Sequence, residues 1–258
     1  MPHVPGSFCW FECGTRDAAA AKTFYTQLFG WSAVDMPMPD TDGDYTLLQM
    51  DGEDIAGLYE LSGPQFEGVP SHWMNYVTVE STDQSVARAQ ELGAKVLQPP
   101  MDVPGAGRMA MLADPGGATI AVFELGDHKG ASEKTILGWG ELHTPDTAQA
   151  KNFYTQLFPW VAKDDPKGGY AEFQLHGRSI GGMMAIPPER REHMPPCWML
   201  YAMVEDCDDA LQRATKLGAS VIVPPQDIPD VGRFAVITDP TGASIALIRL
   251  TIPGATTE

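Results

Sequence analysis

Hydrophobic and polar residues alternate over several short stretches of this chain, which is the pattern of half-buried β-strands. In the stretch of residues 7–13, for example, Trp10 and Glu12 fall on the same face. From Asp17 to Gly30 the apolar residues instead recur at intervals of three and four, which is typical of a helix with one buried side. Asp17 is a suitable N-cap for this helix and Gly30 a suitable C-terminal residue.

The same reading applied to the whole chain predicts four consecutive βαβββ modules and therefore an α+β fold. The predicted helices span residues 17–29, 83–92, 147–158 and 208–217. The predicted strands span residues 7–13, 32–36, 45–50, 55–61, 72–79, 95–98, 108–112, 119–125, 137–143, 172–175, 180–186, 198–204, 221–223, 233–237 and 244–250.

Two long blocks of the sequence occur twice. The block Lys22–Trp31 returns as Lys151–Trp160, at an offset of 129 residues (151 − 22), and residues 73–125 return as 198–250, at an offset of 125 (198 − 73). Because each repeat is long enough to hold its own core, we predict two copies of a whole domain joined by a polar linker. The predicted first domain, linker and second domain are residues 1–126, 127–135 and 136–258.

The composition limits the classes of function. The formal net charge is −17, which argues against binding to nucleic acid or to anionic membranes, because both require basic patches. No apolar run approaches 18 residues and no signal peptide is visible, and four cysteines without a small-domain framework suggest reduced thiols. We therefore expect a cytoplasmic protein with a small-molecule ligand, either a monomer, since duplication can replace dimerisation, or a homodimer.

Two motifs occur once in each copy. Phe-Tyr-Thr-Gln-Leu-Phe precedes Trp31 and Trp160, and Asp-Pro-x-Gly begins at Asp114 and at Asp239. Together with the βαβββ pairs, these motifs resemble the vicinal oxygen chelate superfamily, which includes glyoxalase I, bleomycin-resistance proteins and extradiol dioxygenases. The resemblance is closest to a tandem, glyoxalase-like branch. It implies two glyoxalase-like domains whose strands form cupped, incomplete β-barrels around a cavity, with the helices outside.

In the metalloenzymes of that superfamily, four side chains in the cavity hold a divalent ion. The positions that correspond to these ligands are Trp10, Gly57, Met74 and Ala121 in the first copy and Trp139, Gly182, Met199 and Ala246 in the second. None of them offers a side-chain nitrogen or oxygen of the kind such ions require. We therefore expect no metal ion at these positions and no other cofactor.

Four residues are candidates for acid/base catalysis because they fall on the cavity face of predicted strands. A carboxyl group in a Trp-lined cavity is partly desolvated, which raises its pKa and suits a general base. Alternatively, the acids lie at the rim, solvated or paired with Arg108 or Arg233, and the histidines are hydrogen-bonded rim residues. The four candidates are Glu12, His72, Glu141 and His143.

A second group of residues is a candidate for ligand binding. Aromatic and thioether side chains on the cavity face can line an apolar pocket, and an arginine before a strand can bind a carboxylate or phosphate. Alternatively, the apolar members are barrel core, and the arginines hold the Asp-Pro turns through Asp114 or Asp239. The group is Trp10, Met74, Tyr76, Arg108, Trp139, Cys197, Met199, Tyr201 and Arg233. By contrast, Phe24, Tyr25, Phe153 and Tyr154 are assigned to the core.

Three functions remain open at this point. The first is a glyoxalase-like enzyme that works without a metal and uses Glu12 or Glu141 on a small carbonyl or hydroxylated aromatic compound. The second is a bleomycin-resistance-type protein that binds an apolar or aromatic ligand without turnover. The third is a metal-dependent lactoylglutathione lyase or dioxygenase whose ligands have moved to residues such as Glu12, His72, Glu141 and His143.

The geometry of the cavities is also open. Each cavity could form within one copy, or the modules could exchange so that Glu12 meets Cys197 while His143 meets His72. In either case we predict that the two sites differ, because the repeat aligns His143 with Gly14 and Cys197 with His72.

Overall fold

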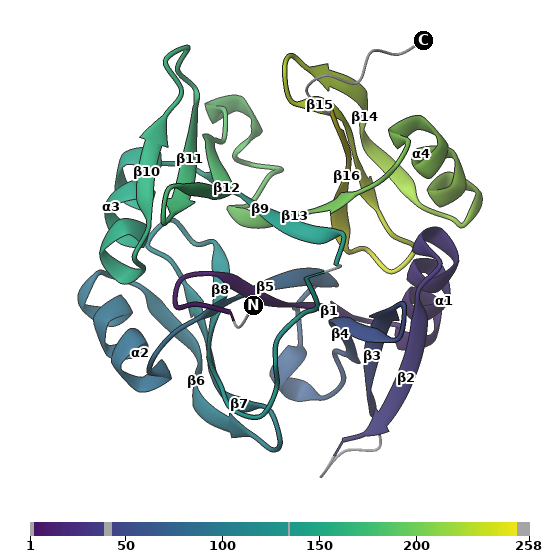
Figure 1. The fold of residues 1–258 in the computed structure, drawn as a ribbon, viewed down its shortest axis with the longest axis horizontal. Coiled ribbons are helices and arrows are strands. Elements are labelled where there is room, and N and C mark those ends of the chain that lie inside the picture. Colours follow the sequence, from purple (N-terminus) through teal and green to yellow (C-terminus); the bar gives the residue numbers. More distant parts are fainter. Residues whose placement is uncertain (1–2, 39–42, 134, 252–258) are drawn as a thin grey trace. The chain divides into compact units, whose positions relative to one another are not determined.

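The strands of each copy form one open sheet. The computed structural model describes residues 3–38, 43–133 and 135–251, and these residues form sixteen strands and four α-helices. Figure 1 shows their arrangement. The first sheet has the strand order β2-β3-β4-β1-β5-β8-β7-β6, and the second repeats it as β10-β11-β12-β9-β13-β16-β15-β14. The α+β class and the four βαβββ modules are therefore as predicted.

The first two modules contain two α-helices, a short 3₁₀ helix and eight strands. They are β1 (Phe8–Thr15), α1 (Ala18–Phe29), β2 (Ser32–Pro37), β3 (Asp44–Met50), β4 (Glu53–Glu60), η1 (Pro64–Phe66), β5 (His72–Thr78), α2 (Thr82–Glu91), β6 (Lys95–Val103), β7 (Gly107–Ala113) and β8 (Thr119–Leu125).

The last two modules follow the same order. They are β9 (Leu137–Thr144), α3 (Thr147–Leu157), β10 (Val161–Asp164), β11 (Tyr170–Leu175), β12 (Arg178–Ala185), η2 (Pro188–Arg190), β13 (Cys197–Met203), α4 (Cys207–Lys216), β14 (Ser220–Ile228), β15 (Gly232–Thr238) and β16 (Ser244–Leu250). None of the described helices has the length and apolar character needed to span a bilayer.

The helices begin and end where the sequence predicts, because their caps are local. Asp17 and Asp146 each accept a hydrogen bond from a backbone N–H in the first turn of α1 and α3. Gly30 ends α1 with a left-handed backbone at φ 73°, a conformation that glycine adopts without a steric cost.

The sequence analysis missed one strand and shortened two. The four-residue strand β10 was not predicted. β6 and β14 continue beyond the proline pairs at residues 99–100 and 224–225, where we placed their ends. Both are edge strands, and the prolines fall where the pairing register shifts, so no ladder hydrogen bond is lost.

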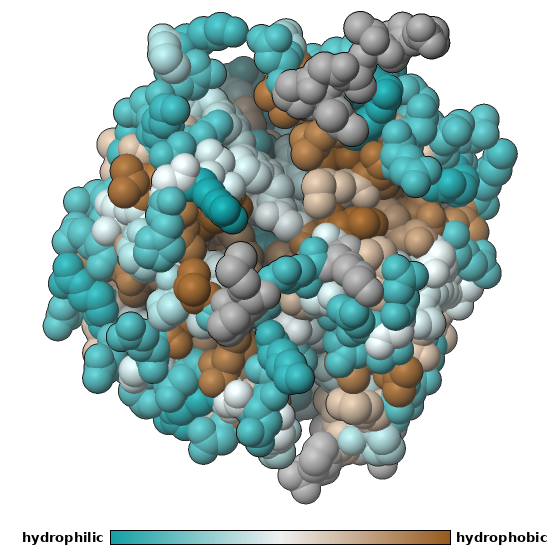
Figure 2. Space-filling model, viewed as in Figure 1, coloured by the Kyte–Doolittle hydropathy of each residue, from teal (hydrophilic) through white to brown (hydrophobic). Residues whose placement is uncertain are grey.

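These proline-interrupted edges carry exposed apolar side chains. Leu97 on β6 is 52% exposed and Ile222 on β14 is 53% exposed. Figure 2 shows hydrophobic residues gathered in the region of β14–β16. Prolines at a sheet edge interrupt the row of N–H groups that would otherwise pair with another strand, and so limit edge-to-edge association.

Contacts group the modules differently from the predicted domains. Unit 1 comprises residues 1–11, 74–133 and 139–199, and unit 2 comprises residues 12–73, 134–138 and 200–258. The division passes through β1, β5, β9 and β13, the first strand of each module. Unit 1 thus combines the second and third modules, and unit 2 combines the first and fourth.

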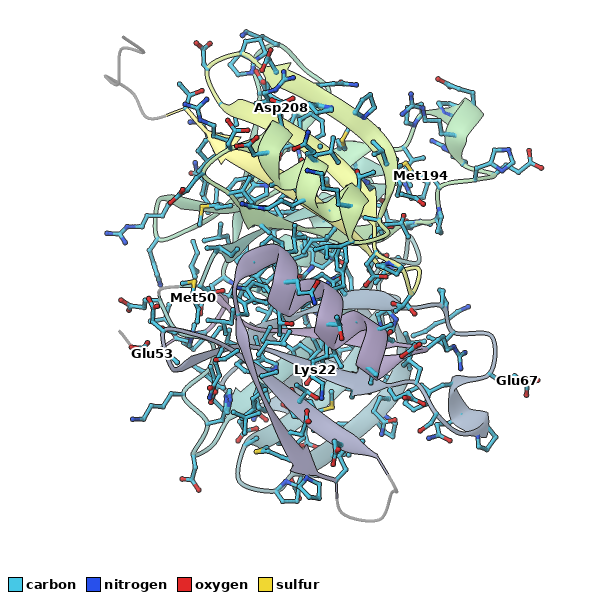
Figure 3. All side chains as sticks on the ribbon, turned by 90° about the vertical axis from the view of Figure 1, so that its right-hand side faces the viewer. Lys22, Met50, Glu53, Glu67, Met194 and Asp208 are labelled. Carbon is cyan, nitrogen blue, oxygen red and sulfur yellow. The ribbon has the colours of Figure 1, made fainter. Side chains whose placement is uncertain are left out.

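Each unit places two helices against each other. In unit 1, α2 contacts α3, and in unit 2, α1 contacts α4 (Figure 1). Figure 3 shows the second pair from the side, with Lys22 marking α1 and Asp208 marking α4. The two helices of each pair come from different copies of the repeat.

A buried tyrosine stands at the centre of the core of unit 1. Tyr154 on α3 donates a hydrogen bond of 2.8 Å to Asp114 and accepts one of 2.8 Å from the indole N–H of Trp198. Tyr154 and Trp198 belong to a cluster of apolar side chains that includes Phe153 and Phe173. Burial raises the pKa of Tyr154 well above its ordinary value, so its hydroxyl remains a donor.

Unit 2 contains the same arrangement. Tyr25 on α1 donates to Asp239 at 2.8 Å and accepts from Trp73 at 2.8 Å. In both units, therefore, the Phe-Tyr helix of one copy binds the Asp-Pro turn of the other copy. The assignment of the Phe-Tyr residues to the core is confirmed, since each of the four is at most 2% exposed.

We predict that Tyr154→Phe lowers the free energy of unfolding by about 2–4 kcal/mol, because it leaves the buried Asp114 carboxyl and the Trp198 N–H without this partner. Chemical denaturation measures the loss. A double-mutant cycle with Asp114→Asn should show coupling. The control is Lys151→Met on the same helix, whose exposed ion pair with Asp164 contributes less than about 1 kcal/mol. Equal losses in the two variants would contradict the prediction.

Candidate functional site

Strand β9 carries the acid/base candidates of the second copy, all within unit 1. Glu141 and His143 are two residues apart and lie on the same face of the strand. The two residues are 8% and 7% exposed, so both are removed from solvent. Parallel pairing with β12 sets Glu141 opposite Gly182.

Both carboxylate oxygens of Glu141 are hydrogen-bonded. Oε1 lies 2.8 Å from Nε2 of His143, and Oε2 accepts a bond of 3.0 Å from the Tyr170 hydroxyl. Burial and the charge of Glu141 raise the pKa of Tyr170, so this tyrosine stays protonated and donates. The carboxylate is therefore held in one orientation rather than solvated at a rim.

His143 is a buried cation at neutral pH. Burial alone would lower its pKa, but the Cys197 thiol and the Glu141 carboxylate outweigh that effect and raise the pKa of His143 from 6.5 to about 9. Its Nδ1 atom is buried and has no hydrogen-bond partner among the described residues. Nδ1 is thus the nitrogen of the ring that Glu141 does not occupy, and the Cys197 thiol interacts with the same ring.

The first copy has an analogous but different cluster, all within unit 2. Glu12 is half-buried and accepts a hydrogen bond of 2.6 Å from Tyr45. The position of His143 is taken by Gly14, where a methyl group would lie 3.2 Å from Cε1 of His72. Nδ1 of His72 lies 2.9 Å from a carbonyl oxygen in its own loop.

These contacts show which strand supplies the neighbour of each site residue. His143 interacts with Cys197 of its own copy, and Gly14 faces His72 of its own copy. For these residues the contacts are those of the arrangement within one copy. The reason is that β9 lies beside β13, and β1 beside β5, in their respective sheets.

Two glycines stand where the family resemblance places the metal ligand of the fourth strand. A side chain at Gly57 would overlap the Tyr45 hydroxyl, and one at Gly182 would overlap the Tyr170 hydroxyl. Because glycine has no side chain, each phenol can pass over the intervening strand and reach its glutamate. The tyrosines thus occupy the space in which a ligand side chain would begin.

The remaining side chains also do not fit a metal ion. The other corresponding positions are Trp, Met and Ala, and across residues 3–38, 43–133 and 135–251 no group of three or more His, Cys, Asp or Glu side chains is suited to hold one. The relocated ligand set of the third hypothesis is therefore not assembled in the described part of the chain. Divalent ions need several converging nitrogen or oxygen donors.

The sequence analysis did not identify Tyr45 and Tyr170 as site residues. The available signal was that they are equivalent in the repeat, at an offset of 125 residues (170 − 45). Tyr170 is the first residue of β11, and Tyr45 is the second residue of β3. Their role depends on the register between strands, which the repeat does not reveal.

The tryptophan and methionine candidates differ in exposure between the two copies. All four of them lie in unit 1. Trp10 and Met74 are each 3% exposed, and the Trp10 ring packs edge-on against His128 at a centroid distance of 4.6 Å. Their counterparts Trp139 and Met199 are half-buried. A residue of the predicted linker thus packs on the tryptophan of the first copy, whereas that of the second copy is more accessible.

The remaining ligand-binding candidates are two tyrosines, one cysteine and two arginines. Tyr76 and Tyr201 are 3% and 5% exposed and pack against Phe123 and Phe234 respectively. Cys197 is half-buried at the start of β13.

The two arginines are already paired with acids. Arg108 bonds both carboxylate oxygens of Asp83 and also Asp102, and Arg233 does the same with Asp208 and Asp227. The interpretation that they hold the Asp-Pro turns through Asp114 or Asp239 is wrong. Those two carboxylates instead accept hydrogen bonds from Tyr154 and Tyr25, which lie on the packed side of the helices.

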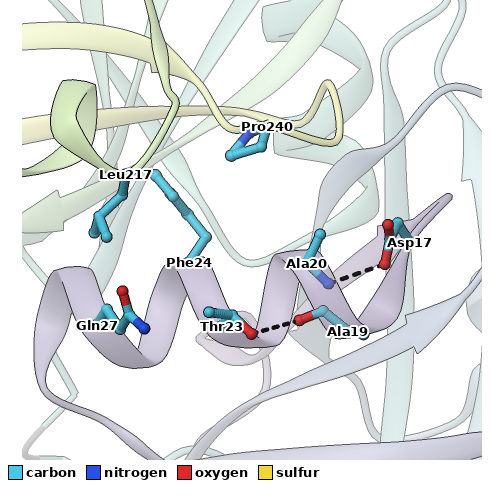
Figure 4. A pocket seen from close by; sticks show the side chains of 8 residues that line it. All are labelled: Asp17, Ala19, Ala20, Thr23, Phe24, Gln27, Leu217 and Pro240. Atoms are coloured by element: carbon cyan, nitrogen blue, oxygen red, sulfur yellow. Dashed lines mark hydrogen bonds between the residues drawn. The ribbon is translucent and has the colours of Figure 1, made fainter.

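A surface groove in unit 2 lies apart from these clusters. Its volume is about 440 Å³, and it runs along α1 beside Leu217 and Pro240 (Figure 4). The ionisable side chain among its lining residues is Asp17, which is used to cap the helix at Ala20. The groove therefore has few side chains that could take part in catalysis, and the Glu141 cluster is the better candidate site.

The chain is similar to known proteins in both sequence and fold. The profile of the Glyoxalase/Bleomycin resistance protein/Dioxygenase superfamily matches residues 8–122 and 136–247. A Mycobacterium bovis protein named "Putative glyoxylase CFP32" is 34% identical over 246 residues, which are 93% of each chain. The anthracycline biosynthesis protein DauV of a Streptomyces species is 33% identical over 263 residues, 96% of this chain and 94% of that protein.

A solved structure supports the fold. The Mn(II)-bound glyoxalase from Novosphingobium aromaticivorans superposes with a TM-score of 0.64 at 17% identity, over 95% of this chain and 82% of that chain. At this identity the likeness concerns the arrangement of helices and strands, and the functional residues have to be judged from their own geometry.

We predict that Gly182→Ala destabilises the protein by about 1–3 kcal/mol, because the new methyl group displaces the Tyr170 ring. The matched control is Gly138→Ala, also on a strand, where a methyl group would meet no atom within 4 Å. Thermal or chemical unfolding measures both. The loss should shrink in a Tyr170→Ala background, and an unchanged loss there would show that the ring is not the obstacle.

We predict that His143 contributes stability that depends on pH. Because its pKa of about 9 in the folded protein exceeds the ordinary value of 6.5, the contribution is complete below pH 6.5 and disappears as the pH rises through 9. Compared with His143→Gln, the unaltered protein should lose on the order of 1–3 kcal/mol between pH 6 and pH 9.5. An NMR titration should give a lower pKa of His143 in Glu141→Gln. Parallel stability curves for the unaltered protein and His143→Gln would refute the effect.

Proposed function

Because the chain belongs to the glyoxalase/bleomycin resistance protein/dioxygenase superfamily, we propose that it is an enzyme that applies acid/base catalysis to a small carbonyl or hydroxylated aromatic compound in its second copy. The observation that carries this proposal is the buried hydrogen bond of 2.8 Å between Glu141 and His143. Buried titratable groups with strongly shifted pKa values, as found for His143, are concentrated at functional sites.

The hydrogen bonds of Glu141 and His143 indicate the role of each residue. Both oxygens of Glu141 are occupied, so its task is to orient and charge His143 rather than to meet the ligand directly. As an imidazolium, His143 can donate the proton of Nδ1 to a carbonyl oxygen, and the neutral imidazole that remains can accept a proton in return. General acid/base groups of this kind contribute about 10²–10⁴-fold to rate.

The proposed mechanism contains no step through a metal ion. The family's ligand positions offer Trp, Gly, Met and Ala side chains, and a tyrosine hydroxyl fills the space at the glycine. In this proposal the charge that develops on a carbonyl oxygen is stabilised by the imidazolium of His143, since a buried cation interacts strongly with such a charge.

Two observations favour a carbonyl-bearing, aromatic ligand. Trp139 and Met199 provide half-buried apolar surface of the kind that lines small-molecule pockets. Two relatives are named for a glyoxylase and for anthracycline biosynthesis, and both terms concern compounds with carbonyl groups.

A binding protein without turnover is the second candidate. The hydrogen bonds that occupy both oxygens of Glu141 favour it, because a fully paired carboxylate can also serve only to stabilise the sheet. The two candidates differ in what Glu141→Gln changes. In a binding protein this variant should alter ligand affinity by no more than about 1 kcal/mol and should have no activity to remove.

We predict that Glu141→Gln and His143→Gln each lower kcat/KM by about 10²–10⁴-fold, while Glu12→Gln, the matched change in the first copy, has little effect. Turnover is measured with methylglyoxal, alone and as its glutathione hemithioacetal, in the presence of a chelator. Binding is measured with 1,4-dihydroxyanthraquinone through quenching of tryptophan fluorescence.

The outcomes separate the candidates. Turnover that is unchanged in Glu141→Gln would overturn the proposed roles. Binding of the anthraquinone without turnover of either methylglyoxal species would favour the binding protein. Activity that is lost in chelator and restored by a divalent ion would show that a metal takes part despite the poor donor set.

A further inference from the structure

The cysteines of this chain are not equivalent in their surroundings. Cys9, Cys13 and Cys207 are buried, whereas Cys197 is half-buried. Burial raises the pKa of Cys9 to about 12 and that of Cys207 to about 11, which keeps both as unreactive thiols. Cys197 therefore stands out as the thiol that a reagent or ligand can reach.

Cys197 neighbours the imidazole of His143, since β13 lies beside β9 in the sheet and the thiol interacts with the ring. The imidazole is 7% exposed, its Nε2 is bound to Glu141, and its buried Nδ1 has no hydrogen-bond partner among the described residues. Besides Glu141, Cys197 is the group that raises the pKa of this histidine. The equivalent positions in the first copy are also close, since a methyl group at Gly14 would lie 3.2 Å from Cε1 of His72.

Four side chains on three strands contact one another in succession. Tyr170 on β11 donates to Glu141 on β9, Glu141 binds His143 on β9, and His143 neighbours Cys197 on β13. The order of groups is thiol, imidazole and carboxylate, which is the order that activates a nucleophile in cysteine-dependent catalysis on unrelated folds. Tyr170 adds a fixed donor behind the carboxylate.

We propose that Cys197 is a nucleophile that adds reversibly to the carbonyl carbon of an aldehyde or α-oxoaldehyde ligand. His143 is the acid/base partner of the thiol, and Glu141 and Tyr170 are positioning residues that act through His143. This inference rests on the proposed function for the location of the site, and it adds a covalent step to it.

The step is balanced without any oxidant or reductant. The reacting state is an ion pair of the Cys197 thiolate, whose proton has moved to the imidazole, and the His143 imidazolium. The thiolate sulfur forms a bond to the carbonyl carbon, and the π electrons of the C=O bond move to the oxygen. His143 transfers its proton from Nδ1 to that oxygen, which gives a neutral thiohemiacetal and a neutral imidazole. The reverse transfer releases the ligand unchanged and restores the ion pair.

An imidazolium beside a thiol favours the thiolate, which is the reactive form. The titratable groups that face the pair are Glu141 on its own strand and Tyr170 from β11. Because the carboxylate favours the protonated imidazole, removing Glu141 should slow the reaction of Cys197 with an electrophile. Tyr170→Phe should slow it by less, because the carboxylate itself remains.

Limited alkylation with iodoacetamide at pH 6.5, followed by peptide mass spectrometry, tests the thiol in the unaltered, folded protein. Cys197 should react at least about tenfold faster than N-acetylcysteine, while the other three cysteines stay unlabelled. His143→Gln should reduce the rate to that of the free thiol, Glu141→Gln should reduce it severalfold, and the matched variant Glu12→Gln should leave it unchanged. A rate equal to that of N-acetylcysteine in the unaltered protein would overturn the proposal.

Methylglyoxal tests the adduct. It should protect Cys197 from alkylation, and the protection should disappear after dialysis, whereas no protection at millimolar methylglyoxal would overturn the covalent step. Cys197→Ser should lose turnover of free methylglyoxal. If Cys197→Ser keeps full activity on both methylglyoxal and its hemithioacetal, the nucleophile is refuted while the acid/base function stands. If Glu141→Gln also keeps full activity, the proposed function fails as well.

Discussion

A tyrosine hydroxyl held between a tryptophan N–H and a buried carboxyl group is the interaction on which each unit of this protein depends. Asp114 is buried, and its carboxyl group has partners only because Tyr154 and the N–H groups of its own turn converge on it. A buried carboxyl group without such partners would destabilise the fold by several kcal/mol. The helix with the tyrosine and the turn with the aspartate are therefore required together, and they come from different copies of the repeat.

The helices contact turns of the other copy, whereas each sheet contains strands of one copy only. Each eight-stranded sheet is built from one copy, so β9, β11 and β13 bring Glu141, Tyr170 and Cys197 to the same region of unit 1. The helices hold the modules together, and the sheets position the polar groups. Changes in the polar groups are thus separated from the contacts that stabilise the core, which allows the two copies to differ in chemistry while they share a fold.

The polar groups have diverged at a few positions. Gly57 and Gly182 admit a tyrosine hydroxyl in both copies, which replaces a potential metal ligand with a neutral donor. The second copy has His143 where the first has Gly14, and Cys197 where the first has His72. The linker residue His128 packs on the tryptophan of the first copy as well. These differences are the basis for locating the chemistry in the second copy.

The sequence by itself determined the four helices, all of the described strands except β10, the buried faces and the lack of metal donors at the family positions, because periodicity, caps and residue types are local properties. Only the tertiary structure decided that Tyr25 binds Asp239 rather than Asp114, since both turns carry the same motif and are chemically equivalent partners. It also decided that Tyr170 reaches Glu141, because that contact depends on strand register and on the space left by a glycine. Pairing between distant segments is set by packing, and packing is not encoded in any single stretch of the chain.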